Sequence, residues 1–295
     1  MADSAAVIGF IGLGIMGSAM SGRLIQSGYE VLGFDLDAAR MSEHAQRGGT
    51  AASSPAGVAD SAHIVILSLP SSGALRSVFT GPQGICESQH PDLVLVETST
   101  LALDDKLAAR DWAASVGADL LDCPMSGTGS QARTGDLVAY LSGDDQSKRK
   151  AEPVLAAFTR SAKDVGQFGN GTKLKLIANL LVGVHNAAAG EALSLAQSAG
   201  LDPADALGAL ADGAGYSTML GVRGPMMVSG EYLPATMTVD LFMKDLGLIA
   251  SFAEGVGAAT PLLDATTNLY KQASDQLLGK YDTAVVHDII RDLQR

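Results

Sequence analysis

The sequence predicts an α/β protein in which a doubly wound parallel sheet is followed by an all-α domain, with one long interdomain helix joining the two. Three observations predict this fold class. Short apolar runs alternate with amphipathic segments up to about residue 141, a glycine motif directly follows the first run, and helical periodicity takes over beyond Gly169. Glycines within residues 164–170 mark the boundary, which predicts domains of residues 1–165 and 166–295.

The apolar runs of the first domain are its predicted strands. Each is rich in Val, Ile or Leu, and segments of helical length separate them, as expected when crossover helices join parallel strands. Six such runs are enough for a doubly wound sheet. The predicted strands are Val7–Ile11, Glu30–Phe34, Ile64–Leu69, Leu93–Glu97, Asp119–Asp122 and Val138–Ser142.

A change of periodicity marks the second domain. Apolar residues recur at helical spacing from Leu174 to Ala192, which predicts one helix over Gly171–Ala199, about 43 Å long at ~1.5 Å per residue. Its most apolar stretch, Leu176–Gly190, contains polar residues and is shorter than the ~20 residues that span a bilayer, so we expect a buried helix. Further helices are predicted over Pro203–Asp212, Thr238–Val256 and Pro261–Gln276.

Charge and cysteine content narrow the classes of partner. A formal net charge of -12 and a pI near 4.7 disfavour nucleic acid and anionic membrane surfaces. Cys86 and Cys123 lie far apart, so neither a disulfide framework nor a thiolate metal site is predicted. The first residues lack the basic region of an export signal. We therefore expect a cytoplasmic protein without a metal site, a nucleic-acid partner or a membrane anchor.

Three glycines between the first predicted strand and a helical pattern form the strongest local motif. They have the Gly-x-Gly-x-x-Gly spacing that binds dinucleotides in Rossmann-type sheets. The first glycine permits a tight turn, the second lets the backbone approach a pyrophosphate, and the third lets the helix pack on the strand. The predicted cofactor contacts of this loop are Gly12, Leu13, Gly14, Ile15, Met16 and Gly17.

Asp35 follows the second predicted strand, 18 residues after Gly17, where a carboxylate can accept hydrogen bonds from the adenosine ribose. This position favours NAD over NADP as the cofactor because a carboxylate repels a 2′-phosphate, although Arg40 is near enough to attract one. The alternative interpretation is an ordinary glycine turn and a helix-capping aspartate. That alternative requires strand, glycine spacing, helix and acid to coincide by chance.

Two later segments carry polar residues suited to a small anionic substrate. Ser126, Gly127 and Thr128 follow a predicted strand with little side-chain obstruction, so their amides and hydroxyls can bind a carboxylate. Lys175 and Asn179 are four residues apart on the long helix and therefore share a face. Taken singly, the loop is as well explained by a flexible polar turn, and Lys175 by a solvated rim residue.

In combination, these motifs resemble the β-hydroxyacid dehydrogenase family, which includes 3-hydroxyisobutyrate dehydrogenase and tartronate semialdehyde reductase. The similarity extends over nearly the whole chain. Besides the segments above, it includes Leu69 and Pro70, the sequence TST at residues 98–100, and MKDL at residues 243–246. The resemblance implies a nicotinamide-dependent dehydrogenase of small 3-hydroxy acids, or a reductase of the corresponding semialdehydes, that forms a homodimer or homotetramer.

The resemblance also implies a role for each matching residue. Oxidation needs a base on the substrate hydroxyl and reduction needs the same group as an acid, a role that falls to Lys175 once its pKa is lowered from about 10.4. Partial burial beside a second cation would lower this pKa, and Lys244 is the expected cation. The other implied site residues are Ser126, Gly127, Thr128 and Asn179 for the substrate, and Leu69, Pro70, Thr100 and Lys244 for the cofactor.

The chain departs from the family pattern at several positions. Thr128 and Gln131 stand where glycines are usual, Ala178 stands where an asparagine is usual, and a usual proline near Leu103 is missing. We therefore expect an altered substrate pocket with an unchanged reaction class.

Two other functions stay open on the sequence. An imine reductase has a similar two-domain plan but generally lacks a lysine at the position of Lys175. A non-catalytic NAD-binding protein can keep the same fold, because fold does not determine function. The presence of Ser126, Lys175 and Asn179 in one chain favours catalysis over both.

Overall fold

The computed structural model describes residues 7–90 and 92–293, so the opening residues considered above lie outside it. The chain divides into two compact units, residues 1–175 and 176–295. The division falls inside helix α8 (Asn170–Ser198), whose first turn belongs to the first unit. Each unit is described separately.

The first unit is built on a parallel six-stranded sheet in the order β3-β2-β1-β4-β5-β6. This is the strand order of a doubly wound dinucleotide-binding sheet, so the predicted fold class is confirmed. At the centre of the sheet, Phe10 pairs with Gly33 on one side and with Ile66 on the other. The strands are β1 (Val7–Ile11), β2 (Glu30–Phe34), β3 (Thr50–Ala51), β4 (Ile64–Leu67), β5 (Val94–Glu97) and β6 (Asp119–Asp122).

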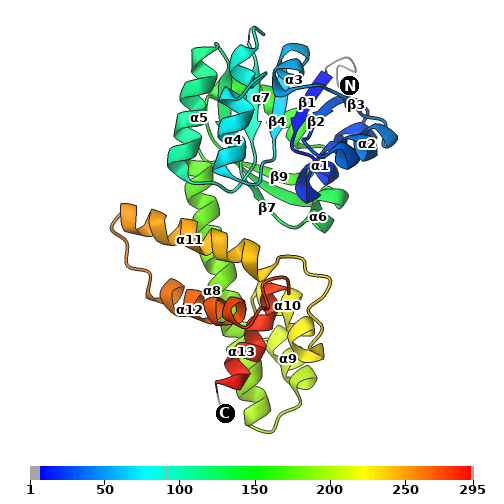
Figure 1. Ribbon diagram of the computed structural model, residues 1–295. Helices are drawn as coiled ribbons and strands as arrows, with labels where there is room; N and C mark the ends of the chain where they lie inside the picture. The colour runs from blue at the N-terminus through cyan, green and yellow to red at the C-terminus, as the bar shows by residue number, and fades with distance from the viewer. Residues whose placement is uncertain (1–6, 91, 294–295) are drawn as a thin grey trace. The chain divides into compact units, whose positions relative to one another are not determined.

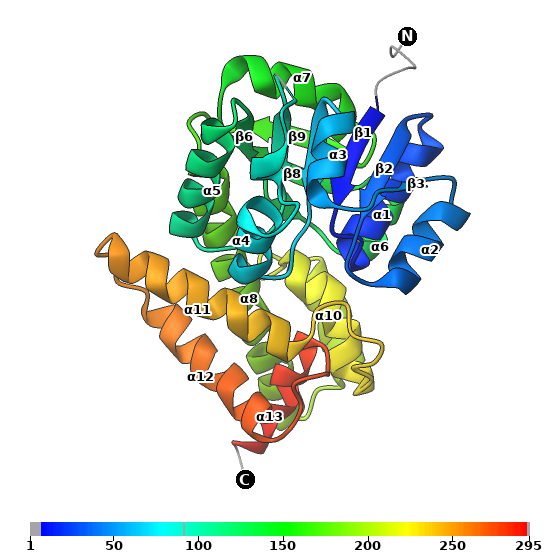
Figure 2. The same cartoon turned by 45° about the horizontal axis from the view of Figure 1, so that its top comes forward.

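Helices cover both faces of this sheet (Figures 1 and 2). Along the central strands, alternate side chains enter different cores: Phe10 and Ile66 lie in one, Ile11 and Val65 in the other. Both faces of a parallel sheet are buried in this way, which is why its strands are continuously apolar. The flanking helices are α1 (Ile15–Gln26), α2 (Ala38–Gln46), α3 (Pro55–Ser61), α4 (Ser72–Thr80) and α5 (Leu103–Ser115), with a 3₁₀ turn at Ile85–Glu87.

A second, three-stranded sheet corrects one prediction. The strand predicted over Val138–Ser142 lies in this sheet as β8 (Leu137–Leu141), between β7 (Met125–Ser126) and β9 (Thr159–Asp164). The sixth strand of the main sheet is instead β3, which is two residues long and carries no periodic pattern. The sequence TRSAKD of β9 is mostly polar and was missed for the same reason. Helices α6 (Gly129–Thr134) and α7 (Asp145–Leu155) separate these strands.

The second unit is helical, as predicted (Figure 1). Three predicted helices are confirmed to within two residues at each end, as α9, α11 and α12. Helix α10 was missed because two glycines and Pro225 interrupt it, and α13 because it is short. After α8 the helices are α9 (Pro203–Ala211), α10 (Thr218–Ser229), α11 (Val239–Gly255), α12 (Pro261–Asp275) and α13 (Val286–Asp292), with a 3₁₀ turn η2 at Thr283–Val285.

Helix α8 packs into the core of the second unit. Leu176 and Leu193 are buried there, and Asn186 donates a hydrogen bond to the hydroxyl of Tyr270 at 2.5 Å. With 29 residues, the helix is long and apolar enough to cross a membrane. The prediction that its apolar part is too short to span a bilayer was therefore wrong. Core helices of soluble proteins meet the same criterion, and buried amides with internal partners are typical of a core helix.

Candidate active site

The glycine loop has the geometry that a dinucleotide needs. Gly12 has a φ of +93°, and a Cβ there would lie 2.2 Å from the Ser68 carbonyl oxygen. A Cβ at Gly17 would lie 1.9 Å from the Gly12 carbonyl oxygen, so neither position accepts a side chain. At Gly14 the nearest atom to a Cβ is 3.9 Å away. The space above the N-terminus of α1 is therefore open to a pyrophosphate, and the residues present fit a dinucleotide.

Asp35 connects this loop to the end of β2. Its Oδ2 accepts a hydrogen bond from the Leu13 N–H at 2.7 Å, and its Oδ1 accepts one from the Asp37 N–H at 2.9 Å. Arg40 lies between two carboxylates, 3.4 Å from Asp35 Oδ2 and 3.5 Å from Asp37 Oδ2. Oδ2 also accepts from Arg40, whereas Oδ1 can accept a second hydrogen bond, which leaves Asp35 able to bind a ribose hydroxyl.

Side chains between the three glycines differ in exposure. The Leu13 side chain is buried in the core, so only its backbone faces a cofactor, whereas Ile15 is 78% exposed. Met16 packs against the core from its edge. Ile15 is therefore the most exposed apolar side chain between the three glycines.

The predicted segments Leu69-Pro70 and Thr100 follow β4 and β5; in the sheet β4 pairs with β1, and β5 pairs with β4. Their carboxyl ends therefore meet the glycine loop at one edge, where doubly wound sheets bind ligands. The Leu69 N–H donates to Ser99 Oγ at 2.7 Å, which ties the two segments together. Ser99 was not among the predicted site residues although it lies in the TST sequence, because its hydrogen bond to Leu69 joins two loops that are distant in sequence.

The predicted substrate loop is more structured than a bare amide cradle. Ser126 ends β7, Gly127 has a φ of +135°, and Thr128 caps α6. The Thr128 N–H donates to Gln131 Oε1 at 3.0 Å, and Gln131 Nε2 donates to Asp136 at 3.2 Å. The two residues that depart from glycine in the family pattern thus form one capping box. The Thr128 amide is already bonded, which restricts its predicted role toward a substrate carboxylate.

The substrate loop and the glycine loop lie side by side within the first unit. Helices α1 and α6 pack together, and a Cβ at Gly129 would lie 2.7 Å from Ile15 Cγ2. A glycine at position 129 is what allows this approach. The two loops predicted to bind cofactor and substrate are therefore neighbours.

Lys175 lies on α8, three residues after Thr172, and is 9% exposed. The Thr172 N–H and Oγ1 donate to the two carboxylate oxygens of Asp122, at 2.7 and 2.8 Å. This contact fixes the first turn of the helix on which Lys175 stands. Lys173 is half-buried and reaches Asn170 Oδ1 at 3.3 Å. Lys175 is thus not a solvated rim residue.

In the second unit, Asn179 is buried and donates from Nδ2 to Asp245 Oδ2 at 2.9 Å. Asp245 belongs to the MKDL sequence of α11, next to the half-buried Lys244. The sequence argument singled out Lys244 and missed Asp245. The signal was present, since Asp245 is in the same motif, but only the fold shows that it orients Asn179.

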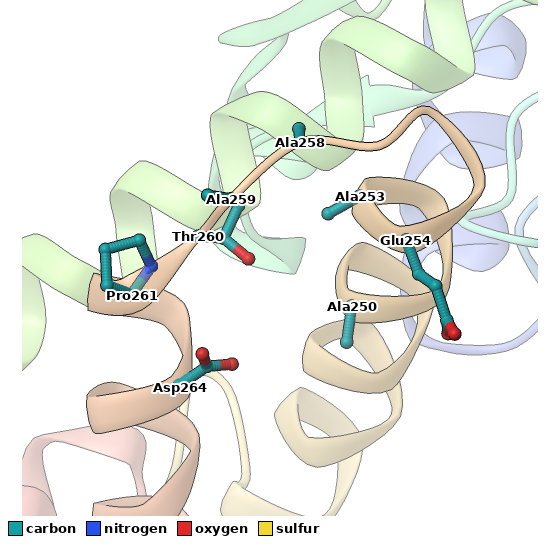
Figure 3. Close-up of a pocket in the computed structure, with 8 residues that line it drawn as sticks. All are labelled: Ala250, Ala253, Glu254, Ala258, Ala259, Thr260, Pro261 and Asp264. Carbon is teal, nitrogen blue, oxygen red and sulfur yellow. The ribbon is translucent and has the colours of Figure 1, made fainter.

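A hollow of about 420 Å³ lies elsewhere in the second unit, between the end of α11 and the start of α12 (Figure 3). Glu254 and Asp264 line it, and none of the predicted site residues does. Two carboxylates disfavour a carboxylate substrate by charge repulsion. Within residues 7–90 and 92–293, no group of three or more His, Cys, Asp or Glu side chains is placed to hold a metal ion.

Two family models match consecutive parts of the chain. Residues 7–168 match the model described as the NAD binding domain of 6-phosphogluconate dehydrogenase. Residues 169–289 match the model described as NAD-binding of NADP-dependent 3-hydroxyisobutyrate dehydrogenase. Both parts of the chain thus match models of nicotinamide-dependent dehydrogenases.

Curated relatives match over nearly the full length. L-threonate dehydrogenase of Cupriavidus necator is 31% identical over 97% of this chain and 97% of the relative. 3-sulfolactaldehyde reductase of Escherichia coli is 32% identical over 97% of this chain and 96% of the relative. These two relatives are named for different small substrates at almost equal identity, so similarity alone does not select one.

Solved structures show the same two-part fold. A 3-hydroxyisobutyrate dehydrogenase of Mycobacterium tuberculosis with L-serine has a TM-score of 0.88 and 27% identity, over 97% of this chain and 99% of that chain. A 3-hydroxyisobutyrate dehydrogenase of Salmonella typhimurium has a TM-score of 0.86 and 28% identity, over 96% of this chain and 99% of that chain. An imine reductase of Streptomyces aurantiacus has a TM-score of 0.66 and 20% identity, over 98% of this chain and 99% of that chain, which shows a shared fold alone.

Proposed function

The chain belongs to the β-hydroxyacid dehydrogenase family, and we propose that it transfers a hydride between a nicotinamide cofactor and a small 3-hydroxy acid or its semialdehyde. One observation carries this proposal. Lys175 is buried one turn after Thr172, which Asp122 anchors at the edge of the sheet where the glycine loop also lies. A fixed, buried amine beside a dinucleotide fold suits proton transfer to or from a substrate oxygen.

In this mechanism Lys175 Nζ takes the proton of the substrate hydroxyl during oxidation and returns it during reduction. When bound, the nicotinamide supplies the hydride chemistry. Ser126 and Gly127 hold the substrate carboxylate with a hydroxyl and backbone amides, since the amide of Thr128 is occupied by Gln131. Asn179, oriented by Asp245, donates its remaining N–H to the substrate.

We propose NAD rather than NADP as the preferred cofactor. Asp35 stands where the adenosine ribose is bound in such sheets, and Arg40 is held between Asp35 and Asp37. A guanidinium already paired with two carboxylates gives little net attraction to a 2′-phosphate.

We also propose that the protein is a homodimer or homotetramer that pairs through α8. Exposed apolar side chains follow one face of this helix, with Ile177 48%, Leu181 50% and Leu195 66% exposed. An exposed apolar stripe along a helix whose other face is packed in the core is typical of an interface. The mass in solution, measured by light scattering, tests the proposal, and Leu181→Glu is expected to yield monomers; a wild-type monomer contradicts it.

A substrate panel tests the activity. The purified chain is incubated with NAD and L-threonate, 3-hydroxyisobutyrate or 2-(hydroxymethyl)glutarate, and in the reverse direction with NADH and 3-sulfolactaldehyde. We expect turnover of at least one of these compounds, followed by NADH absorbance. Tight NADH binding without turnover of any of them supports the non-catalytic alternative, whereas reduction of cyclic imines alone supports an imine reductase.

A further inference from the structure

A fully buried lysine in the first unit joins the two segments that the reaction must align. Lys106, on α5, has no exposed side-chain surface. Its Nζ lies 2.6 Å from Glu97 Oε2 and 2.9 Å from Asp122 Oδ1. These carboxylates end the neighbouring strands β5 and β6, and both are buried as well. Burial of three charges costs free energy unless each charge has partners. The further partners of Glu97 and Asp122 therefore show which segments of the chain the cluster keeps in place.

On one side, the cluster is bonded through Glu97 to the segments after β4 and β5, where the cofactor is predicted to bind. We call this part of the sheet the cofactor edge. Glu97 Oε1 accepts a hydrogen bond from the Ser99 N–H at 3.0 Å. Ser99 Oγ in turn accepts one from the Leu69 N–H at 2.7 Å. Leu69 and the residue after Ser99, Thr100, are both predicted cofactor contacts. A displacement of Glu97 therefore moves backbone that borders the cofactor.

The Asp122 side leads to the helix that carries Lys175. Asp122 accepts two hydrogen bonds from Thr172, whose N–H lies in the first turn of α8 and has no partner within the helix. Ser142 Oγ donates to the Asp122 carbonyl at 3.0 Å and accepts from the Gly171 N–H at 3.1 Å. A Cβ at Gly171 would lie 2.5 Å from the Tyr140 carbonyl oxygen. The first turn of α8 therefore packs directly against the backbone of β8.

We propose that Lys106 is a positioning residue: by binding Glu97 and Asp122 together, it sets the cofactor edge and the Lys175 helix turn at a fixed separation. It does not touch the reactants. The negative carboxylates raise the pKa of Lys106, against the lowering effect of burial, so the amine stays charged and holds both. Displacement of reacting groups by about 1 Å can cost ~100-fold in rate, so loss of this tie is expected to affect turnover.

The test is kinetic and uses the full chain with a substrate from the panel above. In Lys106→Met, assayed well below its melting temperature, we expect kcat to fall about 10-fold and the Kd for NADH to rise several-fold. In Thr172→Val we expect a fall in kcat with the NADH Kd unchanged, because only the Asp122 side is loosened. Thr172→Ser, which keeps the hydroxyl, is expected to restore kcat.

Lys148→Met is the matched control. Lys148 is also mostly buried and forms ion pairs with Asp145 and Asp164 in the same unit, so its ion pairs involve neither Glu97 nor Asp122. Both kcat and the NADH Kd are expected to stay within two-fold of the wild type. A solely structural role for Lys106 would lower the melting temperature in both lysine variants and leave kcat and Kd unchanged.

The inference rests on the proposed function, but a different experimental result contradicts each of them. A wild-type chain without turnover defeats the proposed function. A wild-type chain with turnover that Thr172→Val does not reduce defeats the inference alone, and this variant keeps Lys106 and both carboxylates, so it decides the matter even when Lys106→Met does not fold.

Discussion

Each unit of the molecule contains a fully buried aspartate that pairs with a buried cation and accepts at least one backbone N–H. In the first unit, Asp122 lies 2.9 Å from Lys106 and accepts the N–H of Thr172 at the start of α8. In the second unit, Asp282 lies 3.0 Å from Arg223 and accepts the N–H of Ala284 at the start of η2. The local chemistry is nearly the same.

The difference lies in what each aspartate holds. The helix turn fixed by Asp122 continues to Lys175, whereas Asp282 binds Thr236 and Met237 in the loop before α11. Neither of those loop residues is a predicted site residue. A buried ionic cluster therefore indicates function only through the elements it connects, and the two clusters are expected to respond differently to mutation.

The largest expected effect is on turnover, from Lys175→Ala. Removal of the acid/base is expected to lower kcat by about 10²- to 10⁴-fold, with the Kd for NADH unchanged, because the residue handles the substrate proton and not the dinucleotide. Steady-state kinetics and fluorescence titration with NADH measure the two quantities. Substantial residual turnover would remove Lys175 from the mechanism.

The matching change in the second unit is Arg223→Met, which is expected to act on stability. It leaves Asp282 buried without its cation, for an expected loss of about 3–5 kcal/mol in free energy of unfolding. Urea unfolding measures this loss. The kcat of the folded fraction is expected to stay at the wild-type value, and a fall in kcat comparable to that of Lys106→Met would erase the contrast between the two clusters.

Cofactor preference responds to Asp35. In Asp35→Ala we expect the NAD-to-NADP ratio of kcat/KM to fall about 10-fold or more, since hydrogen bonds to a charged group are worth about 1.5–3 kcal/mol and Arg40 loses one of its two carboxylates. Asp37→Ala is the control, because it removes the other partner of Arg40 and leaves the ribose acceptor in place. An unchanged ratio in Asp35→Ala would exclude a ribose contact.

A smaller effect is expected at Gln131. In Gln131→Ala the Thr128 N–H becomes available to the substrate carboxylate, and the KM for the acid is expected to fall about 2- to 10-fold, the value of one hydrogen bond. Gln131→Glu adds a negative charge to the loop and is expected to raise that KM. Equal KM values in all three proteins would separate the capping box from substrate binding.

The smallest expected effect is on pH dependence in the second unit. Burial raises the pKa of Asp282, but Arg223 and the N–H donors outweigh it, and the pKa lies below its ordinary value. A depressed carboxyl pKa stabilises the fold above the unfolded value of about 3.9 and ceases to do so as pH falls through the folded value. Below about pH 4, the unfolding free energy of the wild type should therefore fall more steeply than that of Asp282→Asn. Parallel curves would contradict the assignment.

Local patterns in the sequence were sufficient for most of the fold. The central strands are continuously apolar because both faces of their sheet are buried, and α8 was predicted within a residue at each end from its helical periodicity. Strands β3 and β9 were not predicted, because β3 has only two residues and β9 is mostly polar. Pairing in a sheet can recruit such segments without any periodic signal of their own.

By itself the sequence determined the doubly wound sheet, the glycine loop and the identity of Lys175 as the residue to examine, since each depends on spacing over a few residues. Only the tertiary structure decided which residues form the hydrogen bonds and ion pairs that position these elements. Lys106 and Asp122 are 16 positions apart, Asp122 and Thr172 are 50, and Asn179 and Asp245 are 66. No local period encodes contacts at such separations, because they form only when strand order brings distant segments to one edge of the sheet or one helix against another.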